Sequence, residues 1–490
     1  MSVSRNESLN ILIGLEIHCQ LTAVNTKLFC SCSSDYREKE PNSVICPVCM
    51  GLPGTLPVLS RSAIEKGMVL ALALGCTPVT RLRFFRKNYF YPDLPKNYQI
   101  TQYDKGGGSP LAYDGAIKIS DSRSIQVTRV NLEEDPGRLT YQGSIQSSPY
   151  SLVDYNRAGV VLAEVVTAPD LRSPAEARAA LEYVQSILEH LSSFDSSLDG
   201  SIRCDANVSL SGGHRIEVKN ITSFKDVERA LSFEITRQKG LLQKGITIKK
   251  ETRHWDERRR ITVSLRAKED EAEYRYFPEP DLLPITISKK ELSGLKATMP
   301  ELPTAKAKRF TDEYGISLES ANTLVRAKGF ADLFEQSYKE LKKNSDKLAN
   351  LLSVDLLGVL NRSETDLADT KITSKQIVRL LKLELSGVIG GPVSKNLLMN
   401  LVKTGKLPDQ ITGEKTKITD KKLLDEAIRT AFKSAPKAVS DAKTNDNAVN
   451  YLLGLIMNLT NGRADPKEAL SLIKIALENS SPESGQPKSQ

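Results

Sequence analysis

The 490-residue sequence contains no run of about eighteen or more apolar residues, so it predicts no membrane-spanning helix. Its first ten residues, MSVSRNESLN, lack the apolar core of a secretory signal peptide. We therefore expect a cytoplasmic location, where the seven cysteines stay reduced and clustered cysteines favour a metal over disulfides. Only four histidines are present, which argues against a chemistry that needs several imidazoles.

A Gly-rich phosphate-binding loop is also missing. No G-x-x-x-x-G-K-[ST] motif occurs, and GGGSP at 106–110 has no lysine and no Ser or Thr at the offsets that such a loop requires. If the protein handles phosphates, it must do so in another way. Several carboxylates holding Mg²⁺ against the phosphate oxygens would be such a way.

The length predicts about three domains. The formal net charge is +8, and residues 371–443 alone contain 15 Lys and Arg against 7 Asp and Glu. Such a basic region fits a nucleic-acid backbone, because phosphates reward clustered cations through counterion release. A solvated helical surface is the alternative.

Three helices are predicted in the first 290 residues. One begins at a capping box of Ser62 and Glu65, another at Ser173, and a third follows Ser223. Strands are predicted at 14–21, 125–132, 160–167, 203–210 and 214–220. Because the strands and helices do not alternate in a regular βαβ order, the predicted class is α+β.

Beyond about Pro303 the apolar residues recur every three or four positions, which predicts helices. The expected division is a β-sheet domain at 1–295, a helical region at 296–412, a helical tail domain at 413–479 and a disordered end at 480–490. The break near 412 rests on the Gly, Pro and Thr residues of TGKLPDQITGEKTKITD, and the disordered end on its Ser and Pro content.

Four cysteines form two close pairs: Cys30 with Cys32, and Cys46 with Cys49. Four thiolates on short loops match the closed tetrahedral shell of a structural zinc. The first pair has one intervening residue where two or more are usual, so four unrelated reduced cysteines are the alternative. The other cysteines, Cys19, Cys76 and Cys204, are predicted to lie in the core.

Carboxylates gather in strand-like segments. In GLEIHCQL (14–21), alternation places Glu16 and His18 on one face, opposite the apolar residues. Glu164 interrupts an apolar run in which an unpaired carboxylate would be costly to bury, and Asp205 precedes another alternating stretch. A dense acidic end closes a further strand at Glu133, Glu134 and Asp135. These acids predict a metal site on one face of a sheet, or else exposed charges and salt-bridge partners of nearby arginines.

RKNYFYPDLPKNYQITQYD at 86–104 interleaves aromatic residues with cations. Aromatics in this pattern can stack bases while the cations hold phosphates. They can equally pack a long ordered loop, and the sequence favours neither interpretation. The aromatic residues concerned are Tyr89, Phe90, Tyr91, Tyr98 and Tyr103.

Together these segments resemble the GatB family, the B subunit of the tRNA-dependent amidotransferase. The resemblance rests on GLEIHCQL, CPVCMGLPGTLPVL, RKNYFYPDLPKNYQITQYD, LEEDPGRL, SLVDYNRAGV, PDLRSP, RCDANVSL, VKNITSF, ETRHWDE and YRYFPEPDLLP. The C-terminal YLLGLIMNLTNGRADP is similar to the tail domain of that family. The resemblance implies a cradle domain with a fold like that of glutamine synthetase, followed by helical domains of which the last, YqeY-like, binds tRNA.

For function, the resemblance implies that ATP activates the side-chain carboxylate of Glu-tRNA(Gln) or Asp-tRNA(Asn), which ammonia then amidates. Catalytic and Mg²⁺-binding roles are implied for Glu16, His18, Glu134, Glu164 and Asp205. The family commonly has a histidine where this chain has Asn131. Zinc at the four cysteines occurs in only part of the family.

The resemblance also implies partners. The sequence has neither an amidase signature with a catalytic lysine nor a paired Cys and His suited to a glutaminase. Two partners are therefore expected, the amidase A subunit with the small C subunit, forming a heterotrimer that binds mischarged tRNA. Two alternatives remain: a related archaeal subunit, for whose large insertion this chain is too short, and a non-catalytic tRNA-binding protein of the same fold.

Overall fold

The computed structural model describes residues 10–120, 122–143, 148–195, 198, 200–210, 213–221, 223–266, 271–407, 421–442, 445–460 and 462–479. Contacts divide the chain into one unit at 1–306 and a second at 307–490. The predicted end at 480–490 and the predicted break near 412 lie outside the described residues. Within the described part, no helix is both long and apolar enough to span a bilayer.

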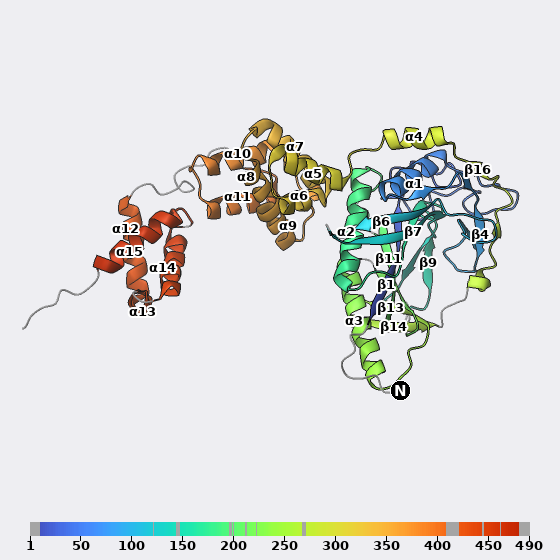
Figure 1. Cartoon of the computed structure of the whole chain (residues 1–490), viewed down its shortest axis with the longest axis horizontal. Coiled ribbons are helices and arrows are strands. Elements are labelled where there is room, and N and C mark those ends of the chain that lie inside the picture. The colour runs from blue at the N-terminus through green and yellow to red at the C-terminus, as the bar shows by residue number, and fades with distance from the viewer. Residues whose placement is uncertain are drawn as a thin grey trace, which may run out of the picture. The chain divides into compact units, whose positions relative to one another are not determined.

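A nine-stranded mixed sheet organises the described part of the first unit (Figure 1). Strands β12 and β13 pair in parallel, and the other neighbours pair antiparallel. With the helices of the second unit, this sheet confirms the predicted α+β class. The strand order is β14 (Ile261–Arg266), β13 (Glu251–Asp256), β12 (Ile216–Ile221), β11 (Ile202–Leu210), β1 (Ile11–Gln20), β10 (Val161–Thr167), β7 (Ser124–Glu134), β6 (Ala112–Lys118) and β2 (Thr77–Pro78).

Smaller sheets extend this unit. In a three-stranded sheet, β4 lies between β15 and β5, and the other two sheets are single strand pairs. Their strands are β15 (Phe277–Pro278), β4 (Phe85–Asn88) and β5 (Tyr98–Thr101); β16 (Ile285–Thr286) and β3 (Arg81–Leu82); and β8 (Arg138–Tyr141) and β9 (Ser151–Asp154).

Helices pack on one face of the large sheet, where Ile13, Leu15, Ile17 and Cys19 of β1 are buried. The predicted start at Ser173 is confirmed, since its side chain accepts a hydrogen bond from the Glu176 amide. The predicted capping box at Ser62 is wrong. The helix already begins at Arg61, and its N-cap Ser60 donates a backbone hydrogen bond to the Leu28 carbonyl. The helices on the sheet are α1 (Arg61–Ala73), α2 (Pro174–His190) and α3 (Phe224–Gln243), and α4 (Lys289–Ala297) packs on α1. The next helix, α5 (Pro303–Tyr314), contains the division between the two units.

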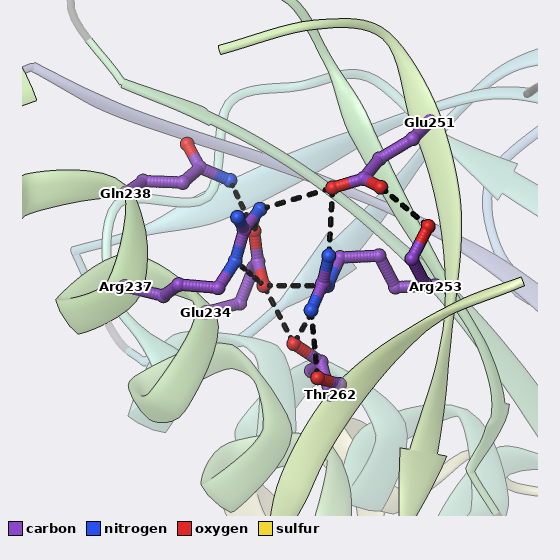
Figure 2. A network of polar contacts seen from close by, with 7 residues as sticks. Glu234, Arg237, Gln238, Glu251, Arg253 and Thr262 are labelled. Carbon is purple, nitrogen blue, oxygen red and sulfur yellow. Dashed lines mark hydrogen bonds and ion pairs between the residues drawn. The ribbon is translucent and has the colours of Figure 1, made fainter. Parts of the chain in front are cut away.

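A buried ionic network fastens α3 to the β13–β14 edge of the sheet (Figure 2). Glu234 is fully buried and accepts from Arg237 at 2.6 Å and from the Thr262 hydroxyl at 2.8 Å. Arg253 lies 3.4 Å from Glu234 and 2.7 Å from Glu251. Since a carboxylate buried without partners would be costly, these contacts fix how the helix lies on the sheet.

The second unit is helical, as predicted, and its described residues form two apolar cores. The first core is built by α5 to α11 and the second by α12 to α15. These helices are α6 (Leu318–Val325), α7 (Lys328–Leu341), α8 (Ser345–Asn350), a π-helical segment (Leu351–Leu356), α9 (Leu357–Ser363), α10 (Ser374–Leu385), α11 (Gly391–Thr404), α12 (Lys421–Ser434), α13 (Pro436–Asp441), α14 (Asp446–Leu459) and α15 (Pro466–Asn479).

Candidate active site

The polar face of β1 lies at the centre of the large sheet, between β10 and β11. The register places Glu164 of β10 directly opposite His18, and Asp205 of β11 directly opposite Glu16. The apolar residues between them point into the helix-covered core. Because opposite residues of paired strands share a face, four side chains predicted from separate segments come together here.

His18 joins two carboxylates. Its Nε2 atom lies 3.3 Å from Glu133 Oε1 of β7 and 3.8 Å from Glu164 Oε1. Asn131 of β7 donates to Glu164 Oε2 at 2.7 Å. Burial, and next the negative charge of Glu164, raise the pKa of Glu133. Carboxylates are the oxygen ligands that a divalent cation such as Mg²⁺ prefers.

A second group of carboxylates adjoins the first along β1. One oxygen each from Glu16, Asp205 and Glu217 of β12 lies within 4.8 Å of the others. Lys219 donates to Asp205 at 2.7 Å. Burial raises the pKa of Asp205, but the positive charge of Lys219 and the neighbouring His18 outweigh it and leave the pKa below its usual value.

Glu134, for which the family resemblance implied a role with these residues, lies elsewhere. It follows Glu133 on β7 and therefore faces the opposite side of the strand. Its carboxylate pairs with Lys96 and accepts from the Ile100 amide at 2.9 Å. The structure brings Glu16, His18, Glu164 and Asp205 together and leaves Glu134 apart from them.

The four predicted zinc ligands also converge. The sulfur atoms of Cys30, Cys32, Cys46 and Cys49 lie within 4.8 Å of one another. A tetrahedral zinc with Zn–S bonds of about 2.3 Å needs sulfur atoms about 3.8 Å apart, so this cluster fits the ion with small adjustments. The remaining cysteines are buried in the main core, as predicted.

Most of the chain matches models of a known protein family. Residues 11–293 match the GatB/GatE catalytic domain, and residues 332–477 match the GatB domain. The chain belongs to the GatB family. Its relatives among the B subunits of aspartyl/glutamyl-tRNA(Asn/Gln) amidotransferase include that of Saccharolobus solfataricus, 47% identical over 95% of this chain and 98% of the relative. The B subunit from Thermotoga maritima is 42% identical over 95% and 98%.

Two acids of this face, Glu217 and Glu133, are not among the residues for which the resemblance implied a role, although Glu133 belongs to the acidic run that predicted a metal site. Glu217 alternates with Ile216 and Val218, and this period-two pattern assigns it to the polar face of β12. Glu133 lies two residues after Asn131 on β7 and therefore shares its face, whereas Glu134 faces the other way. Each pattern is local, but only the strand order shows which side chains of other strands lie on the same face.

Contacts of the aromatic segment 86–104 support its packing as an ordered loop. Tyr103 stacks on Tyr276 with ring centroids 4.2 Å apart, and the Arg86 guanidinium lies 4.4 Å from the Tyr98 ring centroid. These contacts pack an ordered loop. Phe90, however, is 73% exposed. Lys87 is held close to the acidic face, where the neighbouring Tyr89 and Glu133 raise its pKa against the opposing effect of burial.

Proposed function

We propose that this chain is the carboxylate-activating subunit of a tRNA-dependent amidotransferase. In the proposed reaction, the side-chain carboxylate of Glu-tRNA(Gln), Asp-tRNA(Asn) or both attacks the γ-phosphorus of ATP, releasing ADP and giving an acyl phosphate. Ammonia then attacks the acyl carbon, and phosphate leaves. The names of the relatives support this assignment, and they describe those proteins as acting on both kinds of tRNA.

The observation that carries the proposal is the acidic face of the sheet. A carboxylate is a poor acceptor for ammonia until it is activated, and phosphoryl transfer depends on neutralising charge more than on a protein nucleophile. We assign Mg²⁺ binding to two adjoining groups, both reached from β1. These are His18, Glu133 and Glu164 in the first, and Glu16, Asp205 and Glu217 in the second.

When bound there, Mg²⁺ would neutralise the charge that develops on the phosphate oxygens. The chain's own residues prepare the site. Asn131 orients Glu164 by donating to one carboxylate oxygen, and Asn207 does the same for Glu16 at 3.1 Å. Lys219 compensates Asp205 and presents a cation at the edge of the acidic face.

The second part of the proposal concerns assembly. We infer a cytoplasmic heterotrimer with the amidase A subunit plus the small C subunit, since the residues described above offer no ammonia source. Lysine and arginine residues of 371–443 would hold the phosphates of the mischarged tRNA. A structural zinc at the four cysteines would stabilise the loops beside the catalytic sheet.

The test measures γ-phosphate release from ATP by the reconstituted complex, with and without mischarged tRNA. We expect release that depends on the mischarged tRNA and falls on the order of a hundredfold in Glu164→Gln, because a ligand to the charge-neutralising ion is lost. Glu38→Gln is the matched control, since Glu38 is exposed. No tRNA-stimulated release from the wild type would favour the non-catalytic tRNA-binding alternative.

A further inference from the structure

Lys27 is a fully buried lysine beside the four-cysteine cluster. Its side chain is 0% exposed, which is rare for an ammonium group. The Nζ atom donates to the Val44 carbonyl at 2.9 Å, to the Tyr155 carbonyl at 3.4 Å and to Cys49 Sγ at 3.7 Å. The three contacts account for the three donors of an ammonium.

The environment of Lys27 lacks a conventional counter-ion. Within the part of the chain that the structure describes, no ion pair joins Nζ to a carboxylate. Two of its acceptors are neutral carbonyls, so only Cys49 can supply a negative charge at contact distance. A buried ammonium without an anionic partner would be costly.

A metal-bound cysteine cluster supplies that charge. Four thiolates around one Zn²⁺ leave two negative charges uncompensated. Cys49 Sγ also accepts a hydrogen bond from the Cys46 amide at 3.1 Å, so this sulfur accepts from two N–H donors. Hydrogen bonds from outside the ligand set orient metal ligands and tune metal affinity.

We propose that Lys27 is the charge-compensating and positioning residue of the zinc site, acting through the Cys49 thiolate. The inference rests on the zinc proposed above. Lys27 also ties the site to the catalytic sheet, since it bonds the Tyr155 carbonyl while the adjacent Leu28 amide bonds the Gly159 carbonyl at 2.8 Å. Gly159 leads directly into β10, which carries Glu164. Lys27 thereby connects metal binding to the segment that enters the active site.

The experiment follows zinc release from the purified full-length chain to a chelating dye, 4-(2-pyridylazo)resorcinol, together with the zinc content before release. In Lys27→Met, which removes the charge and keeps the length, we expect zinc to be held about 10–100-fold more weakly and to be released correspondingly faster. Lys27→Arg keeps the charge and should release zinc within a few-fold of the wild-type rate. Lys39→Met, at an exposed lysine of the same segment, is the control and should match the wild type.

Two results would overturn the inference in distinguishable ways. A wild-type chain that binds no zinc would remove the zinc site and this role together. A zinc-loaded wild type with unchanged release from Lys27→Met would remove only the role of Lys27. If Lys27→Met does not fold, Lys27→Gln replaces it, because the amide still donates to the carbonyl oxygens of Val44 or Tyr155 but carries no charge. Unchanged release from folded Lys27→Gln would equally refute the proposal.

Discussion

Glu133 and Glu134 are consecutive in the chain, yet their carboxylates serve different environments. Glu133 lies 3.3 Å from His18 Nε2 on the acidic face, whereas Glu134 forms an ion pair with Lys96 on the other side of β7. Both side chains are buried. The alternation of a strand thus separates a carboxylate available for a cation from one already neutralised by a lysine.

This separation predicts different effects for two conservative substitutions. Glu133→Gln should lower γ-phosphoryl transfer on the order of a hundredfold, because it removes charge from the group around His18. Glu134→Gln should leave Lys96 buried without its partner and destabilise the fold by about 3–5 kcal/mol, while transfer by the folded fraction persists. Rapid-quench measurement of transfer, with thermal unfolding of both variants, separates these outcomes.

The opposite pattern would assign the catalytic charge to Glu134, as the family resemblance implied. Binding of mischarged tRNA, measured on the same variants, is the control for a misfolded site. A variant that loses transfer but keeps tRNA affinity identifies a residue of the chemistry.

Glu217 should be a ligand of the second group. Its oxygen lies within 4.8 Å of those of Glu16 and Asp205, and the Thr252 hydroxyl orients it at 3.0 Å. Glu217→Gln should weaken Mn²⁺ binding, measured by electron paramagnetic resonance on the full chain, by about tenfold or more. Glu38→Gln should bind Mn²⁺ like the wild type, and equal binding by Glu217→Gln would exclude this carboxylate from the metal site.

The ionic network of Figure 2 predicts how acid affects the first unit. Burial raises the pKa of Glu251, but hydrogen bonds from Ser264 and Arg253 outweigh it, so the pKa is lower than in the unfolded chain. Ionised Glu251 therefore stabilises the fold above the unfolded pKa of about 4.5, and this contribution is lost as pH falls through the lower, folded value. Glu251→Gln should reduce the loss of stability between about pH 5 and pH 3.

The measurement can use the single tryptophan of the chain, Trp255, which is buried on β13 beside this network. Urea unfolding followed by its fluorescence at each pH reports the relevant part of the fold. Glu38→Gln should keep the wild-type pH dependence. An identical acid dependence in Glu251→Gln and wild type would show that the network does not sense pH in this range.

The basic helices predict salt-dependent tRNA binding. Lys375, Arg379 and Lys382 recur at helical spacing on α10. Replacing all three with glutamine should weaken tRNA binding and make its dependence on salt less steep, because fewer counterions are released. Filter binding over a series of salt concentrations measures both quantities. Replacement of Lys289 and Lys290 of α4 with glutamine is the control. If the salt dependence of tRNA binding is unaltered in the α10 variant, these charges form only a solvated surface.

Sequence reasoning succeeded where the signal was local. Ser173 and Ser223 marked helix starts because their side chains cap the following amides, and the paired cysteines were evident from spacing alone. The choice between Glu133 and Glu134 failed to follow from local pattern, since both belong to the same acidic run. It depends on pairing with β10, and that pairing joins segments distant in sequence.

The position of β1 has a consequence for how the active site is made during synthesis. This first strand of the sheet finds its two neighbours in β10 and β11, so Glu16 pairs with Asp205 only after nearly half the chain has been produced. Until then β1 presents open edges, which are prone to pair with the wrong strand, and pairing across so long a loop is slow. Assembly of the acidic face is therefore a late event of folding, and a chain interrupted before β11 contains Glu16 without Asp205 and Glu217.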